Sequence, residues 1–235
     1  MVLMAEKIAY LTIDDAPSDD FRRKVDLLSG KGIPALFFCE GRRLSGFEDD
    51  VIHAIRQGFV VGNHSWSHRD FSELTEREIR EEIGKTDEAI DGLYTRAGVG
   101  RAFRVFRFPF LKNGGANAAF TQEILKGLGY RQPRFENIAY EWYREKRLHA
   151  DRSVFCTYDS MDWTVADGSH VFGIRDLRDL LDRMDEDVPE GMRGLNSTIS
   201  NEIIMMHDDP RIREMFEPMI ARLVGKGLIF RLPSW

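Results

Sequence analysis

The sequence predicts an α/β fold with a parallel sheet, and three observations lead to this prediction. Short apolar runs alternate with segments of helical periodicity along the whole chain, which is typical of strands joined by crossover helices. No linker, internal repeat or low-complexity segment interrupts this alternation. Five of the predicted strands end in clusters of His, Asp, Arg or Trp. A (β/α) barrel gathers its functional groups over one rim in this way, so a closed barrel is favoured over an open doubly wound sheet.

The elements follow one another in a regular order. The apolar runs predicted to be strands are residues 8–13, 33–39, 59–62, 103–108, 153–158, 202–206 and 228–232. Apolar residues three and four apart predict helices near residues 21–28, 51–55, 79–93, 120–128, 174–184 and 212–224. Thr75 and Glu78 have the form of a capping box in front of the third helix. Residues 139–148 could be an inserted helix, and residues 186–200 are expected to be a loop because Pro and Gly occur there without a period.

The composition is that of one globular domain, residues 1–235. Hydrophobic residues make up 43% of the chain and charged residues 31%, which is enough apolar material for a core. The net charge of −6 argues against a nucleic-acid partner. No apolar run approaches the roughly 20 residues of a membrane span, and the first residues are charged too soon for a signal peptide. We therefore expect a cytoplasmic protein without a membrane partner, with Cys39 and Cys156 as buried free thiols.

His64 and His68 follow directly on the predicted strand 59–62. Four residues correspond to about one helical turn, so a helix would point both imidazoles at one ion. The same spacing is also typical of a solvated helix face. The pair therefore needs partners elsewhere in the chain before it indicates a metal site.

Asp14 and Asp15 end the first predicted strand and provide such partners. One carboxylate together with His64 and His68 would give three protein ligands and an open position for water, which is typical of catalytic zinc. The other carboxylate could then take a proton from that water. The alternative is that the two Asp residues only start a helix or turn before Pro17.

Three further clusters end strands. Arg107 precedes Pro109, and its guanidinium could hold a carboxylate in place. Residues 159–163 offer carboxylates and an aromatic platform for a sugar or another ring. His207 follows four apolar residues and could be a general acid. The respective alternatives are a surface Arg, a turn before a core Trp, and a hydrogen-bonded structural His.

Taken together, the five clusters resemble the motifs of the polysaccharide deacetylase family, also called NodB-homology or carbohydrate esterase family 4. The motif T-F-D-D-G is similar to residues 12–16, and H-[ST]-x-x-H is matched by residues 64–68. R-x-P-[FY] is similar to residues 107–110, and D-x-x-D-W to residues 159–163. The last motif, L-x-H, resembles residues 205–207 with Met in place of Leu. The motifs occur in family order and span most of the chain.

This resemblance implies a distorted (β/α)7 barrel of the NodB type that removes an acetyl group from an N-acetylated (oligo)saccharide. It implies that Asp15, His64 and His68 hold a divalent metal, usually zinc, with Co, Ni or Mn as alternatives. It further implies that Asp14 is the general base that activates the metal-bound water.

The resemblance assigns the remaining site residues as follows. Arg107 orients Asp14, and the backbone N–H of Phe110 helps to stabilise the oxyanion. His207 protonates the departing amine, with Asp162 tuning its pKa, and Trp163 lines the acyl pocket.

Two positions depart from the family pattern, because Ala16 and Leu111 stand where Gly is usual. A side chain at either position is expected to narrow the groove, which favours a smaller substrate than a wall polymer. One alternative is an amidohydrolase of the same superfamily that acts on a non-sugar amide, such as a cyclic ureide or formamide. The other is an inactive carbohydrate-binding relative, in which the base or the acid is expected to be missing. No pattern in the sequence indicates the oligomeric state.

Overall fold

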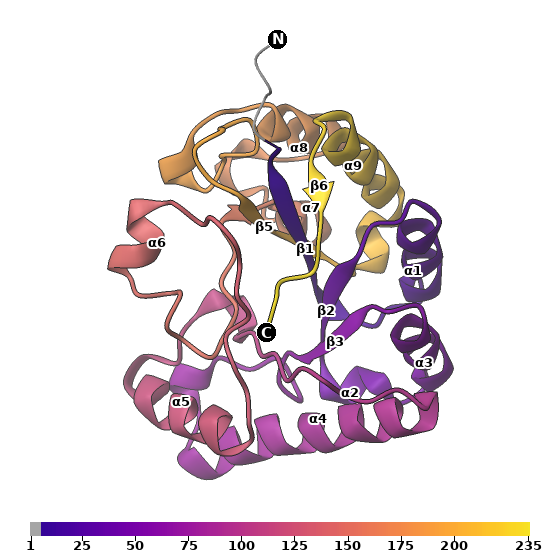
Figure 1. Ribbon diagram of the computed structural model, residues 1–235, viewed down its shortest axis with the longest axis vertical. Coiled ribbons are helices and arrows are strands. Elements are labelled where there is room, and N and C mark those ends of the chain that lie inside the picture. The colour runs from indigo at the N-terminus through magenta and orange to yellow at the C-terminus, as the bar shows by residue number, and fades with distance from the viewer. Residues whose placement is uncertain (1–5) are drawn as a thin grey trace.

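The computed structural model describes residues 6–235, and a curled parallel sheet lies at its centre (Figure 1). The strands are hydrogen-bonded in the order β3–β2–β1–β5–β4, and β6 pairs with the start of β1. Every strand pair is parallel. The bounds are β1 Ile8–Ala16, β2 Ala35–Cys39, β3 Val60–Asn63, β4 Tyr158–Asp159, β5 Glu202–His207 and β6 Ile229–Phe230.

Two single bridges close the sheet into a distorted barrel. Phe106 bridges to Asn63 on one side and to Ser153 on the other. The chain then runs from Ser153 into β4, which pairs with β5 and so leads back to β1. The predicted strands 103–108 and 153–158 are therefore wrong in length. Pro109 starts a 3₁₀ turn directly after the first bridge, and the second segment changes its pairing partner from Phe106 to β5 along its length.

The strands of the barrel are buried on both faces, as parallel strands covered by helices are. All five residues of β2 are fully buried, for example. Helices pack around the outside of the barrel (Figure 1). Each predicted helix is confirmed: α1 Phe21–Gly30, α3 Glu48–Arg56, α4 Glu76–Ala97, α5 Ala118–Gly127, α8 Leu177–Met184 and α9 Arg213–Gly225.

Local sequence signals also predict correctly where some elements begin and where a loop occurs. The capping box of Thr75 and Glu78 is present at the start of α4. Residues 186–200 form a loop with a 3₁₀ turn at Pro189–Gly191. The short helices α2 Gly41–Leu44 and α7 Asp162–Ala166 have no counterpart in the sequence prediction, because one turn of helix leaves no periodic pattern. None of the helices in residues 6–235 combines the length and apolar character that crossing a membrane requires.

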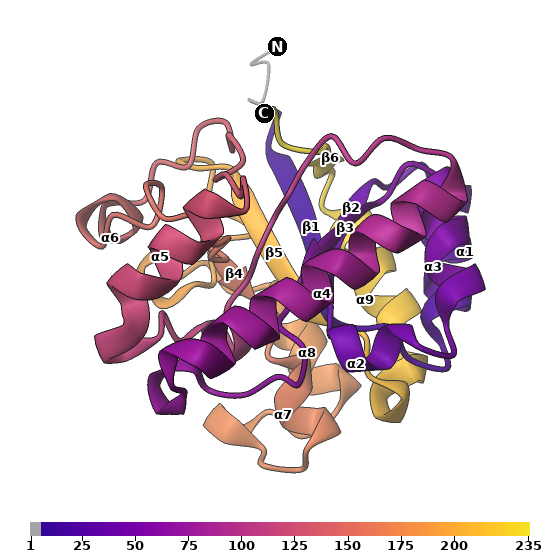
Figure 2. The same cartoon turned by 90° about the horizontal axis from the view of Figure 1, so that it is seen from below.

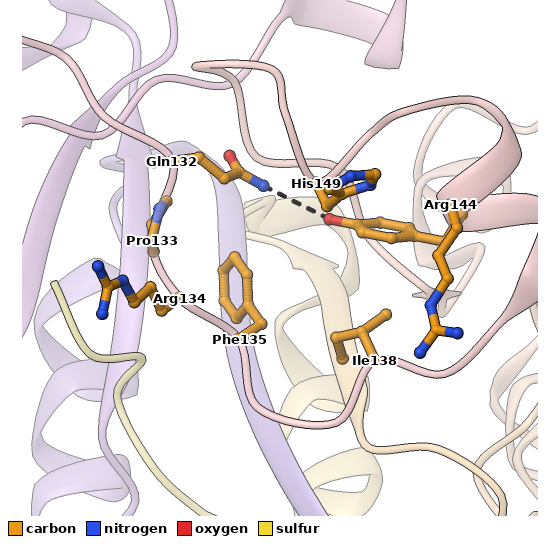
Figure 3. Close-up of a pocket in the computed structure, with 8 residues that line it drawn as sticks. Gln132, Pro133, Arg134, Phe135, Ile138, Arg144 and His149 are labelled. Atoms are coloured by element: carbon orange, nitrogen blue, oxygen red, sulfur yellow. Dashed lines mark hydrogen bonds between the residues drawn. The ribbon is translucent and has the colours of Figure 1, made fainter.

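The segment after α5 covers the amino-terminal end of the barrel. It contains α6 Glu141–Glu145, which is shorter than the helix expected at residues 139–148. The amide of Glu136 donates to the hydroxyl of Tyr10 near the start of β1 (2.9 Å). A cavity of about 460 Å³ lies within this segment, and Figure 3 shows Phe135 and Ile138 among its lining residues. This cavity contains none of the predicted site residues, which lie at the opposite end of β1.

Candidate active site

Asp14 and Asp15 lie at the carboxyl end of β1, where the strand contains one extra residue. Ile13 pairs with Phe37 but Ala16 pairs with Cys39, so β1 advances three residues while β2 advances two. Such a bulge bends the strand and changes where its side chains point. Asp15 has the left-handed φ of 62°, which Asp tolerates better than most residues. Neighbouring side chains of a regular strand point to opposite faces, whereas here both carboxylates line the same cavity.

A buried guanidinium holds Asp14. Nη1 of Arg107 donates to Oδ1 of Asp14 (2.6 Å) and to the hydroxyl of Thr12 (2.7 Å). Nε of Arg107 donates to the carbonyl of Val154 (3.0 Å). Arg107 is fully buried and Asp14 is nearly so. The alternative of a surface Arg is therefore wrong, and the guanidinium of Arg107 holds the carboxylate of Asp14 in place.

The helical interpretation of the His64–His68 spacing is wrong. Both residues lie in the loop that follows β3, not in a helix. Ser65 and His68 have left-handed φ values of 67° and 57°, and these two bends turn the chain back on itself. The centroids of the two imidazole rings lie 4.9 Å apart. The predicted convergence is therefore present, but a turn produces it.

The two imidazoles face Asp15. Its Oδ1 lies 3.4 Å from Nε2 of His64 and 3.2 Å from Nε2 of His68. This oxygen is buried and has no hydrogen-bond partner among residues 6–235. Burial raises the pKa of Asp15, but the neighbouring His64 and His68 lower this pKa well below its usual value. Asp15 is therefore a carboxylate that faces two ring nitrogens.

The other ring nitrogen of His64 lies 2.9 Å from the carbonyl of Arg107. A carbonyl only accepts, so Nδ1 of His64 donates this bond and Nε2 is left to act as a ligand. A buried carboxylate oxygen that has no donor among residues 6–235 and lies beside two ring nitrogens fits a cation with nitrogen and oxygen ligands. The residues Asp15, His64 and His68 together form a possible metal site.

A second imidazole–carboxylate pair lies at the end of β5. Nδ1 of His207 is 2.6 Å from Oδ1 of Asp162, and the amide of His207 donates to Oδ2 (2.9 Å). Asp162 is the first residue of α7 and is almost fully buried. Burial lowers the pKa of His207, but the carboxylate of Asp162, together with the smaller effects of Asp15 and Asp14, outweighs burial and raises this pKa to about 10. The imidazole of His207 is therefore held with Nδ1 against the carboxylate, and Nε2 has no hydrogen-bond partner within the described residues.

One cavity joins these groups. It has a volume of about 420 Å³, and α7, which contributes Trp163 to it, lies at the end of the molecule opposite the C-terminus (Figure 2). Leu111 lines the cavity, whereas Ala16 is buried and does not, so the expectation that Ala16 narrows the site is wrong. Two predicted site residues, Arg107 and Asp162, do not line the cavity but contact residues that do. The seven predicted site residues that line it are Asp14, Asp15, His64, His68, Phe110, Trp163 and His207.

Phe110 forms part of the wall beside the histidines. Its ring packs edge-on against the ring of His68, with centroids 4.5 Å apart. More than half of this side chain is nevertheless exposed (58%). Phe110 and Leu111 both have left-handed backbones (φ 58° and 54°). Strain of this kind is common at functional sites, and here it turns the loop after Pro109 toward the cavity.

Asp208 and Lys24 are buried polar residues that support the site, and the sequence prediction missed both. Asp208 accepts hydrogen bonds from the amide and hydroxyl of Ser18 (both 2.7 Å) and from Nζ of Lys24 (2.6 Å). Its own amide donates to the carbonyl of Asp14 (2.8 Å). Asp208 therefore ties the end of β5 to the loop after β1. The available signal is Lys24, which interrupts the apolar face of α1 and so requires a buried acidic partner.

Family comparison agrees with this geometry. A family model described as polysaccharide deacetylase matches residues 3–133. The putative polysaccharide deacetylase YheN of Bacillus subtilis is 26% identical over 97% of this chain and 67% of its own length. Peptidoglycan-N-acetylglucosamine deacetylase of Bacillus cereus is 36% identical over 35% of this chain and 30% of its own length. The chain thus spans between about a third and two thirds of these curated relatives.

Solved structures share the fold. A family 4 carbohydrate esterase from Streptomyces lividans superposes with a TM-score of 0.65 at 21% identity, over 96% of this chain and 92% of its own. A family 4 pseudoenzyme from Bacillus anthracis superposes with a TM-score of 0.63 at 19% identity, over 97% of this chain and 64% of its own. The predicted fold class is confirmed. Because an esterase and a pseudoenzyme share this fold, activity has to be argued from the site.

Proposed function

Because the chain belongs to the polysaccharide deacetylase family, we propose that it is a metal-dependent hydrolase that removes an acetyl group from an N-acetylated (oligo)saccharide. One observation carries this proposal. Oδ1 of Asp15, which has no hydrogen-bond partner among residues 6–235, faces two imidazole nitrogens in a cavity. The same cavity contains the Arg107-bound Asp14 and the Asp162-bound His207. A metal site, a base and an acid around one cavity are the parts that amide hydrolysis requires.

In this proposal Asp15, His64 and His68 hold the metal. Two nitrogens and one oxygen suit zinc sites that keep an open position, and Co, Ni or Mn are the alternatives. When bound, the metal supplies Lewis acidity that polarises the acetyl carbonyl and makes water easier to deprotonate.

Asp14 acts as the general base. Arg107 occupies its Oδ1, which leaves Oδ2 to take a proton from the attacking water. That oxygen lies 3.8 Å from Nε2 of His64, so it is next to the proposed metal ligands. The side chain of Asp15 has no Lys or Arg partner in the described part of the chain, which supports the assignment of Asp15 as the ligand and Asp14 as the base.

His207 acts as the general acid. Asp162 binds Nδ1 and stabilises the protonated ring, so Nε2 can give its proton to the amine that leaves. Trp163 and Phe110 line the same cavity and would contact the acetyl group. The backbone N–H of Phe110 would support the oxyanion.

An inactive relative would lack the base or the acid. Asp14 and His207 both line the cavity of this chain, which supports turnover over binding alone. The saccharide substrate is supported by the family and by the activities in the relatives' names.

Acetate release from N-acetylglucosamine oligomers tests the proposal. We expect release by zinc-loaded protein, its loss with a chelator and its recovery when zinc is added back. If the chelator has no effect, the metal requirement is wrong. If zinc-loaded protein releases no acetate from any oligomer, the saccharide substrate is wrong, and a non-sugar amide such as a cyclic ureide or formamide replaces it.

A further inference from the structure

The loop that carries the two histidines has no regular secondary structure, yet each of its backbone amides from residue 64 to 68 has a partner. The amide of His64 donates to the carbonyl of Cys39 (3.0 Å). The amide of Ser65 donates to Oδ1 of Asn63 (2.8 Å), and that of His68 donates to the hydroxyl of Ser65 (3.0 Å). These three partners come from the loop itself or from the neighbouring strand.

The two central amides depend on one distant side chain. Oε2 of Glu82 accepts from the amides of Trp66 (2.9 Å) and Ser67 (2.8 Å), and Oε1 accepts from the hydroxyl of Ser67 (2.5 Å). Glu82 belongs to α4 and is only 7% exposed. Both oxygens of its carboxylate therefore accept hydrogen bonds from the turn between the two proposed metal ligands.

We propose that Glu82 is a positioning residue that holds His64 and His68 in a metal-binding arrangement before any metal arrives. This inference rests on the proposed metal site and adds the residue that positions two of its proposed ligands. Hydrogen bonds to a charged acceptor are among the stronger ones in proteins, and those of Glu82 bridge the bends at Ser65 and His68. Without them, the left-handed conformations of both residues would lose their main support from α4.

The opposite side of the loop is also fixed. The amides of Gly41 and Arg42 donate to the carbonyls of Ser65 (2.9 Å) and Trp66 (3.0 Å). A Cβ atom at Gly41 would lie 2.5 Å from the Trp66 ring, so only Gly permits this approach of α2. The loop therefore lies between α2, which supplies donors, and α4, which supplies one acceptor group. Of the contacts described from α2 and α4, those of α2 are made by backbone amides, whereas those of Glu82 come from a side chain that substitution can remove.

Zinc affinity of Glu82→Ala, Glu82→Gln and Glu81→Gln, measured by competition with a chelating dye, tests this role. Glu81 precedes Glu82 in α4 but is about half exposed, so Glu81→Gln is the matched control. Residues that orient metal ligands typically contribute roughly 10- to 100-fold in metal affinity. We expect a loss of that size in Glu82→Ala, a smaller loss in Glu82→Gln, which keeps an acceptor oxygen, and wild-type affinity in Glu81→Gln.

Hydrogen exchange of the metal-free proteins separates this inference from the proposed metal site. We expect the amides of residues 64–68 to exchange faster in both Glu82 variants, while the strands keep wild-type exchange. If Glu82→Ala is unfolded, Glu82→Gln alone decides. Unchanged exchange at residues 64–68, or unchanged zinc affinity in a folded variant, would overturn the role of Glu82. If wild-type protein binds no zinc, the metal site fails, and exchange still decides whether Glu82 holds the loop.

Discussion

Two acidic residues at opposite ends of the central strands have different surroundings: Glu202 is fully buried, whereas Asp15 is partly exposed but has its Oδ1 buried. At the amino-terminal end of β5, both carboxylate oxygens of Glu202 have donors. Tyr140 and Lys7 donate to Oε1, and Thr157 donates to Oε2 (2.6 Å). At the carboxyl end of β1, Oδ1 of Asp15 has no donor among residues 6–235.

The difference separates a carboxylate that stabilises the fold from one that is available to bind a ligand. A buried carboxylate with all its partners present is part of the framework, whereas an unpaired one costs free energy unless something binds it. Glu202 therefore closes the base of the barrel, together with the segment that contains α6. Oδ1 of Asp15, without a donor among residues 6–235, is the position at which the proposed metal would bind. The following predictions test whether this contrast is correct.

His64→Ala should have the largest effect. It removes one of three proposed ligands, so we expect loss of stoichiometric zinc and of all measurable acetate release. The zinc content of the dialysed protein measures the first loss, and turnover at saturating zinc measures the second. Wild-type zinc content would mean that His64 is not a ligand. His53 is partly buried, pairs with Asp26 and does not line the cavity, so His53→Ala is a control that should leave zinc content and turnover unchanged.

Asp14→Asn should lower turnover by roughly 10²- to 10⁴-fold, the usual contribution of a general base. The amide keeps the shape of the side chain and still accepts from Arg107, so we expect the fold to remain. The rate constant kcat on an N-acetylated oligomer, measured with zinc present, gives the effect. A variant with more than about a tenth of wild-type kcat would exclude Asp14 as the base.

Asp162→Asn should change the pH dependence. Asp162 raises the pKa of His207 to about 10, so His207 stays protonated below that pH and can act as an acid. Without the carboxylate this pKa falls, and we expect the alkaline limb of kcat/KM to move to lower pH. An unmoved limb would contradict the assignment of His207.

The same pair makes a pH-dependent contribution to folding. The pKa of His207 is higher in the folded protein than its ordinary value of 6.5. The stabilisation is therefore fully present below pH 6.5 and is lost as pH rises through about 10. The difference in free energy of unfolding between wild type and Asp162→Asn should shrink over this range, which urea denaturation at several pH values measures.

Glu202→Gln should have the smallest effect on catalysis. It replaces a charged acceptor by a neutral one, and we expect the free energy of unfolding to fall by about 1–3 kcal/mol. Zinc content and kcat per folded molecule should stay at wild-type values. A specific loss of zinc in this variant would mean that the two ends of the barrel are not independent.

The sequence predicted much of the site because its residues follow apolar runs. Asp14 and His207 each come directly after such a run, and Arg107 lies near the end of another. Parallel strands bring their carboxyl ends to one edge. The long helices were predictable for a similar reason, since α4 has a capping box and a long apolar face. Such signals are local in the chain.

The remaining features depend on partners that are far apart in the sequence. The turn between His64 and His68 is held by Glu82, and the bulge at Asp15 exists only in the pairing of β1 with β2. The single bridges of Phe106 likewise require two segments that sequence patterns do not align. Glu82 and Lys24 do leave a trace, because each is a charged residue on the buried face of a helix.

The zinc content of Asp14→Asn and Asp15→Asn, compared side by side, tests the central claim most directly. The two residues are neighbours and the substitutions are identical, so the two variants differ in which of the two carboxylates is lost. We predict about one zinc ion per chain in Asp14→Asn, as in the wild type, and a loss of zinc in Asp15→Asn. The reverse result, with zinc lost from Asp14→Asn and kept by Asp15→Asn, would contradict the assignment of Asp15 as the ligand and Asp14 as the base.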